Sequence, residues 1–241
     1  MKRVAYLIAV ALFLSGLVHL GILVATGGTW EGPLSWRKPA VFGLSFGLTL
    51  LTIAWVASFV QLRERTRSIL LGAFTAACVL ETALVSLQTW RGVPSHFNLE
   101  TPFDALVTRA LAGGGAALVV IIVALTLASF RRNPATPAAM RLAVRTGLLI
   151  LCVAMATGGI MIARGMTLVF SGDAASAYAT GGALKPTHAV TMHAVLVLPA
   201  LAWLLSRSAV NEKRQIGIVR LACVTYLVIA IAVAIGNIVI L

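Results

Sequence analysis

The chain has 241 residues, of which 60% are hydrophobic and only 11% are charged. Soluble domains average about 45–50% apolar and about 25% charged residues, so this composition excludes a soluble globular protein. The formal net charge is +12, but every polar stretch is short, and none offers the basic folded face that nucleic-acid binding requires. Nucleic acid is therefore not an expected partner.

Seven runs of about 20 apolar residues follow one another, and each can cross a bilayer core of roughly 30 Å. Backbone groups in lipid must be hydrogen-bonded within their own segment, so these runs are predicted to be helices. We expect an all-α, polytopic membrane protein, with a bundle of seven transmembrane helices forming a single domain over residues 1–241. The predicted spans are about 4–26, 39–60, 68–90, 106–130, 143–169, 187–206 and 217–240.

Basic residues are distributed unevenly between the two ends of these spans. Of the 19 lysines and arginines, 13 fall on one side. They are Lys2, Arg3, Arg63, Arg65, Arg67, Arg131, Arg132, Arg141, Arg145, Arg207, Lys213, Arg214 and Arg220. The positive-inside rule then predicts a cytoplasmic amino terminus and an extracytoplasmic carboxyl terminus at Leu241.

Ionisable side chains recur at one depth on the outer side. At 1.5 Å per residue, His19 and His193 are expected about 10 Å below the outer boundary, and Glu81 about 13 Å below it. Such residues are costly in lipid and usually face the bundle interior, a cavity or one another. We therefore expect Glu81 and His193, with His19 or His188, to converge on one cavity that opens to the extracytoplasmic side.

A structural interpretation of the same residues stays open. A lone intramembrane histidine is often a helix–helix hydrogen-bond partner, worth about 0.6–2 kcal/mol, and His19 fits that description. His96, in the connection after the third span, is equally compatible with a loop residue at the headgroup level. Glu81 can also serve only to hold helices together.

The connection between the third and fourth spans is rich in hydrogen-bonding side chains. Gln88 follows Glu81 by seven residues, so both project from one side of their helix. We expect Gln88 and Arg91 to line the cavity and an ordered loop over residues 94–103 to close it, with His96 and Phe97 packed inward.

Short motifs predict local structure near this connection. Thr101-Pro102-x-Asp104 is typical of a helix start, with Asp104 favoured at the positive helix terminus. The small residues at 113–115 (GGG) and 157–159 (TGG) indicate tight helix packing. Arg109 and Arg164 are candidate counter-charges for the acidic residues of the outer side.

Spacing limits the cofactor chemistry. His188 and His193 are five residues apart, about 140° around a helix, so they cannot grip one ion from one face, and a zinc site of the H-E-x-x-H type is excluded. A metal ion would have to recruit His19, Glu81 and His193 from separate helices. A b-type haem would need two axial histidines, which His19 with His193 or His188 provides. The candidate cofactor-binding residues are His19, His188, Gln88, Arg91 and His96.

Three blocks of the sequence resemble an uncharacterised family of bacterial multi-pass membrane proteins. They are WRKPAVFGLSFG, ETALVSLQTWRGVPSHFNLETPFDA and THAVTMHAVLVLPALAWLL, which contain an R-G-x-x-S-H-F-N pattern and an H-x4-H-A-x3-L-P pattern. The resemblance covers most of the chain and implies a multi-pass protein of the bacterial inner membrane, with no particular activity.

The resulting prediction is a membrane enzyme, metal-dependent, haem-dependent or of the acid–base type, that acts on a small or lipophilic substrate. Its candidate catalytic residues are Glu81, His193 and Asp104. Two alternatives stay open: a transporter or channel for a small solute or protons, and an accessory subunit of a membrane complex. The expected partners are the lipid bilayer, a small-molecule or lipid-like ligand, and a second copy of the chain or a membrane-complex subunit.

Overall fold

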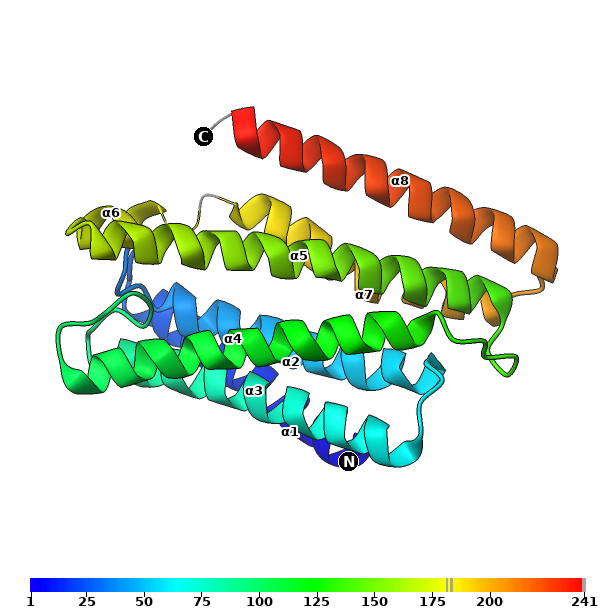
Figure 1. Cartoon of the computed structure of the whole chain (residues 1–241), viewed down its shortest axis with the longest axis horizontal. Coiled ribbons are helices and arrows are strands. Elements are labelled where there is room, and N and C mark those ends of the chain that lie inside the picture. Colours follow the sequence, from blue (N-terminus) through cyan, green and yellow to red (C-terminus); the bar gives the residue numbers. More distant parts are fainter. Residues whose placement is uncertain (181, 183, 240–241) are drawn as a thin grey trace. The chain divides into compact units, whose positions relative to one another are not determined.

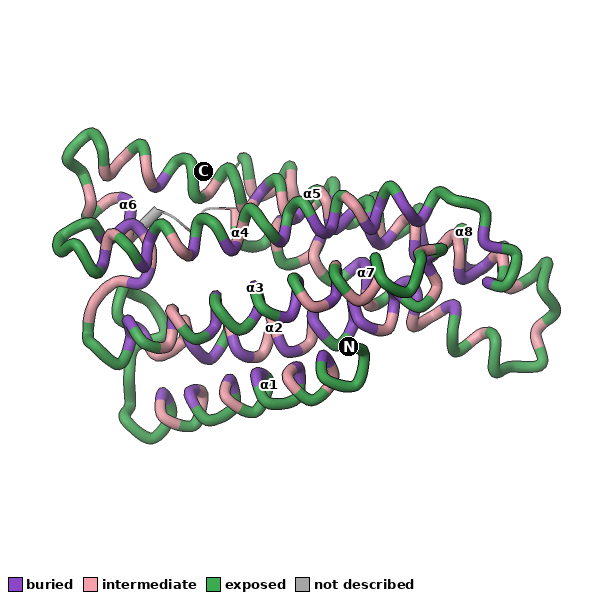
Figure 2. Tube along the Cα trace, turned by 60° about the horizontal axis from the view of Figure 1, so that its bottom comes forward, coloured by how far each residue is buried: buried purple, intermediate pink, exposed green. Residues whose placement is uncertain are grey.

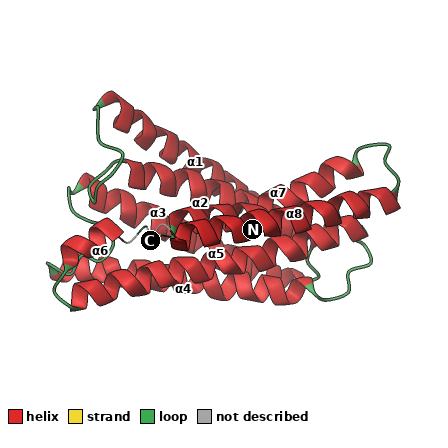
Figure 3. Ribbon diagram, turned by 90° about the horizontal axis from the view of Figure 1, so that it is seen from above, coloured by secondary structure: helices red, strands yellow, loops and turns green. Residues whose placement is uncertain are grey.

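The computed structural model describes residues 1–180, 182 and 184–239 (Figure 1). In this part of the chain every element is a helix (Figure 3). Seven helices are long and apolar enough to cross a membrane, which confirms the all-α class and the prediction of seven long apolar helices. The prediction for the carboxyl terminus concerns Leu241, which lies outside the described residues.

The seven long helices agree with the predicted spans to within about five residues, because hydropathy dominates the choice of membrane segments. They are α1 (Lys2–Ala25), α2 (Arg37–Val56, continued by the 3₁₀ turn η1, Ala57–Phe59), α3 (Glu64–Trp90), α4 (Pro102–Ser129), α5 (Ala138–Phe170), α7 (Lys185–Ser206) and α8 (Glu212–Val239).

The short helix α6 (Ala174–Thr180) was not predicted. Its start is fixed by Asp173, whose side chain accepts a hydrogen bond of 3.0 Å from the backbone N–H of Ser176. This is the usual arrangement of an N-cap residue. The bonds from Ser176 hold the pKa of Asp173 below its ordinary value. A helix of seven residues leaves no periodic pattern long enough to detect from sequence.

The contacts divide the described residues into two compact units. Unit 1 contains Met1–Ala54, Arg65–Ile121 and the part of α5 that begins at Ile162, together with α6. Unit 2 contains Trp55–Glu64, Ile122–Met161, and the helices α7 and α8.

In unit 1, α1 and α2 approach each other through glycines. A Cβ atom at Gly16 would lie 2.5 Å from the backbone nitrogen of Leu44, and one at Gly43 would lie 2.5 Å from that of Gly16. One at Gly47 would lie 2.7 Å from the carbonyl oxygen of Ala9. Gly43 and Gly47 form a G-x-x-x-G pair, the pattern that permits close backbone contact in membranes.

The buried residues of α1 recur every three or four positions and so form one face of the helix, while its other face is exposed (Figure 2). They are Ala5, Ala9, Leu12, Gly16, His19 and Leu23.

In unit 2, polar side chains join the helices at both ends. The Tyr226 hydroxyl donates a 2.8 Å bond to the carbonyl of Val190, which joins α8 to α7. The Asn133 amide donates a 2.9 Å bond to the carbonyl of Phe59, which joins the α4–α5 connection to η1. Arg145 then donates to the carbonyl of Ser129 at 2.9 Å, so the last turn of α4 is tied to α5.

Candidate functional site

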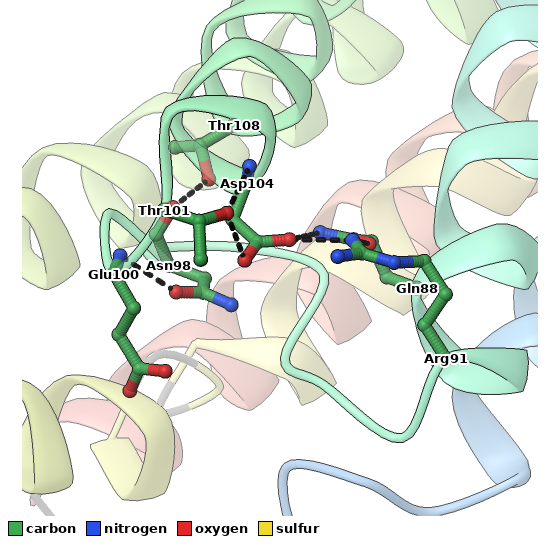
Figure 4. A network of polar contacts seen from close by, with 7 residues as sticks. All are labelled: Gln88, Arg91, Asn98, Glu100, Thr101, Asp104 and Thr108. Carbon is green, nitrogen blue, oxygen red and sulfur yellow. Dashed lines mark hydrogen bonds and ion pairs between the residues drawn. The ribbon is translucent and has the colours of Figure 1, made fainter.

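The start of α4 is fixed by a reciprocal cap. The backbone N–H of Asp104 donates to the hydroxyl oxygen of Thr101 at 3.1 Å, and the Thr101 hydroxyl donates to Oδ2 of Asp104 at 2.6 Å (Figure 4). Thr101 is the N-cap and Asp104 the third helical residue, which is the spacing of a capping box. The predicted helix start at Thr101-Pro102-x-Asp104 is confirmed.

The other oxygen of Asp104 joins the end of α3 to the start of α4. Oδ1 accepts a 2.9 Å bond from the Gln88 amide and a 2.5 Å bond from the Arg91 guanidinium, which also donates to the Gln88 carbonyl oxygen. The guanidinium of Arg91 also lies over the Phe103 ring, with 4.7 Å between Cζ and the ring centroid. Asp104 is only 2% exposed, so its burial is compensated by an ion pair and by neutral hydrogen bonds, as a buried carboxylate requires.

The loop that follows α3 is ordered and packs inward, as predicted. Asn98 is fully buried; its Oδ1 accepts the backbone N–H of Glu100 at 3.0 Å, and its carbonyl accepts the Thr108 hydroxyl at 2.8 Å. Phe97 is buried with φ of 66°, an uncommon conformation for a bulky residue. Its ring occupies the space that a side chain at Gly165 of α5 would fill.

His96 lies beside two aromatic rings. Its ring centroid is 5.7 Å from that of Phe42 and 6.1 Å from that of Phe97, and its Nδ1 is 3.0 Å from the Ser95 hydroxyl. Burial, together with the nearby positive charge of Lys38, lowers the pKa of His96 to about 4. The imidazole is therefore neutral at physiological pH, and it closes the loop onto α2 as a packed ring.

Glu81 has a different environment from Asp104. It is 4% exposed and lies in the interface of α3 with α4, where a Cβ atom at Gly114 would be 2.5 Å from its Oε1. No described residue donates a hydrogen bond to Oε1. Gln88 and Arg91 were predicted to line the same cavity as Glu81. Both side chains bond to Asp104, and Gln88 lies about 10 Å farther along α3 than Glu81.

His19 is bonded at both ring nitrogens. Its Nδ1 donates to the carbonyl of Ser15 at 2.8 Å, and its Nε2 accepts the indole N–H of Trp90 at 3.1 Å. These roles assign the neutral tautomer with the proton on Nδ1. The His19 ring also stacks on the Trp36 ring, with 6.1 Å between the ring centroids. His19 thus joins α1 to α3 as a hydrogen-bond partner, and neither nitrogen is free to ligate a metal or haem in this arrangement.

His188 and His193, the two histidines of α7, belong to unit 2. His188 donates through Nδ1 to the carbonyl of Ala154 at 2.7 Å, which joins α7 to α5. His193 is exposed and donates through Nδ1 to the carbonyl of Ala189, one turn earlier, at 2.6 Å. Since Glu81 belongs to unit 1, its convergence with His193 or His188 stays a prediction.

Within the part of the chain that the structure describes, no three His, Cys, Asp or Glu side chains are grouped so that they could hold a metal ion. The predicted metal set of His19, Glu81 and His193 therefore gains no support.

Two features of unit 1 were not predicted from the sequence. Arg109 and Arg164 were the candidate counter-charges, yet the partner of Asp104 is Arg91, and the Trp90 side chain had no assigned role. No short-range signal identifies either pairing. The glycines at 113–115 did predict tight packing, and the contact is made by Gly114, whereas Gly113 and Gly115 have no atom within 4 Å of an added Cβ.

No known protein family, curated protein or solved structure matches this chain. The fold and the site therefore define the molecule only as an all-helical protein with seven candidate membrane spans, one paired buried carboxyl group and one that has an unbonded oxygen.

Proposed function

We propose that this chain is an integral membrane protein that uses Glu81 in acid–base chemistry on a small or lipophilic substrate. The observation that carries the proposal is the free Oε1 of a carboxyl group that is 4% exposed. A buried polar atom left without a hydrogen bond costs about 1–3 kcal/mol. A buried carboxyl oxygen that is not used to bond neighbouring helices is available for proton transfer, a role that Glu and Asp side chains serve in general acid–base catalysis.

Comparison with Asp104 supports a functional role for Glu81. A carboxyl that holds helices together should bond its neighbours, and Asp104 does so through Gln88, Arg91 and Thr101. Glu81 lies in the same unit without such partners on Oε1. Gly114 leaves the carboxyl room against α4, and the free oxygen can accept a proton or bind a donor group of a substrate.

The proposal includes a location and an orientation. We place the protein in the bacterial inner membrane with its amino terminus in the cytoplasm. The 13-to-6 distribution of its 19 basic residues supports this topology. Glu81 then lies in the outer half of α3, on the side that carries the ordered loop 94–103.

A lipophilic carbodiimide tests the proposal, because it adds to a carboxyl group that is protonated and reachable from lipid. Purified protein in lipid nanodiscs is treated over a pH series, and the labelled residues are located by peptide mass spectrometry. We expect labelling at Glu81 that decreases as pH rises, is lost in Glu81→Gln and is unchanged in the control Glu64→Gln. Folded protein that is never labelled at Glu81, or that is labelled equally at every pH, would contradict the proposal.

A further inference from the structure

Unit 1 carries an apolar groove of about 760 Å³ between α1, α3 and α4, called the α3 groove below. It runs from Met1 and Gly72, past Ala76 and Ala83, to Leu106 and Phe103. One hydroxyl lies in its wall, that of Thr75, and it already donates to the carbonyl of Leu71 at 2.7 Å. The wall therefore offers contacts to hydrocarbon and no free hydrogen-bonding group.

The α3 groove is long enough to hold an acyl chain of one leaflet, and it continues past the middle of α3 toward Phe103. Its α3 wall extends from Gly72 to Leu84, which at 1.5 Å per residue is about 18 Å. Half of a bilayer core is roughly 15 Å. Gly72, which has no side chain, and the small Ala76 leave space along this wall, and Met1 closes its end: a Cβ atom at Gly72 would lie 3.2 Å from Cε of Met1.

The two ends of the α3 groove differ in charge. The Met1 end of the groove is the end at which α1 and α3 begin. Their first turns carry Lys2, Arg3 and Arg65, all exposed, and Glu64 is also in the first turn of α3. The positive ends of the two helix dipoles also point there. At the other end Arg91 stacks on Phe103 and is already paired with Asp104.

We propose that the α3 groove binds one acyl chain of an anionic phospholipid of the cytoplasmic leaflet, whose phosphate lies against Lys2, Arg3 and Arg65. The proposal uses the inferred orientation of the chain but not the chemistry of Glu81. Clusters of basic residues at the cytoplasmic ends of spans are attracted to anionic lipid. A bound chain packs α1, which is buried along one face only, against α3 and α4.

The test measures retained lipid. Protein is reconstituted in vesicles of phosphatidylglycerol and phosphatidylcholine, extracted into detergent, and its bound lipid counted by native mass spectrometry. The charge variant is Lys2→Gln with Arg65→Gln, and its control is Arg131→Gln with Arg132→Gln. The groove variant is Ala76→Phe, and its control is Ala116→Phe, at an exposed position of α4 outside the groove.

We expect the charge variant to lose about fivefold in retained phosphatidylglycerol for each charge removed, with phosphatidylcholine unchanged. The groove variant should lose both lipids, and both controls and Glu81→Gln should retain them. Retention of phosphatidylglycerol equal to the wild type in the charge variant, equal losses of the two lipids there, or equal losses in a control would overturn the proposal. If Ala76→Phe does not fold, the charge pair still decides the outcome.

Discussion

Single alanine substitutions in the GGG stretch of α4 (Gly113 to Gly115) should separate the cost of a close contact from the gain in helix propensity. Ala is about 1 kcal/mol more favourable than Gly inside a helix, so Gly113→Ala and Gly115→Ala, where an added Cβ meets no atom within 4 Å, should stabilise the protein slightly. In Gly114→Ala the Cβ would lie 2.5 Å from Oε1 of Glu81 and 3.0 Å from Cδ2 of Leu80. Both atoms are the ends of flexible side chains that can shift, so the overpacking should cost about 1 kcal/mol, the low end of the usual range.

The measurement is equilibrium unfolding in detergent micelles. Gly114→Ala should be about 1 kcal/mol less stable than either neighbouring alanine variant. The additional replacement Glu81→Ala should recover part of the loss, because it removes the closer of the two contacts. If the three alanine variants have equal stability, or if Glu81→Ala does not change the effect of Gly114→Ala, the Glu81 carboxyl does not lie against Gly114.

Three further predictions concern the loop between α3 and α4. Asp104→Asn leaves Arg91 without its carboxylate and should reduce the unfolding free energy by about 2–4 kcal/mol; a loss below about 1 kcal/mol would show that the network is not stabilising. The pKa of His96 falls from 6.5 to about 4 on folding, so between these values the unfolded state binds the additional proton, and stability should drop by about 2–3 kcal/mol as pH falls through this range. His96→Phe should remove that pH dependence, and an unchanged slope would refute the assignment. Gly165→Leu should disorder residues around Phe97, seen as faster hydrogen exchange, whereas Gly159→Leu, which meets no neighbour within 4 Å of its Cβ, should not; equal exchange in the two variants would contradict the packing of Phe97.

The features that were predictable from the sequence depend on nearby residues. Apolar runs of about 20 residues require helices in lipid, and this alone located all seven long helices. The cap of α4 was also predictable, because Thr101 and Asp104 are three residues apart and bond each other. The G-x-x-x-G pair at Gly43 and Gly47 belongs to this class, although it was not used.

The features that were missed depend on partners far apart in the sequence. Trp90 bonds His19 across 71 residues, and several other side chains near the same ends of the helices can also donate a hydrogen bond. Arg109 and Arg164 were the candidate counter-charges for Asp104, but Arg91 is its partner because the loop returns α4 to the last turn of α3. The free oxygen of Glu81 likewise follows from the packing of α3 on Gly114. Depth along a span predicts which residues share a level, but the rotation of each helix decides which of them meet.

The most direct test of the central claim is infrared difference spectroscopy of the protein in lipid nanodiscs during a pH titration. The carbonyl stretch of a protonated carboxylic acid is resolved from amide bands, and Glu81→Gln identifies the contribution of Glu81. A carboxyl that exchanges its proton should give a Glu81-dependent band whose intensity falls as pH is raised across the titrated range. A band that stays constant over that range, or no difference between the wild type and Glu81→Gln, would show that Glu81 does not exchange protons and would contradict the proposed function.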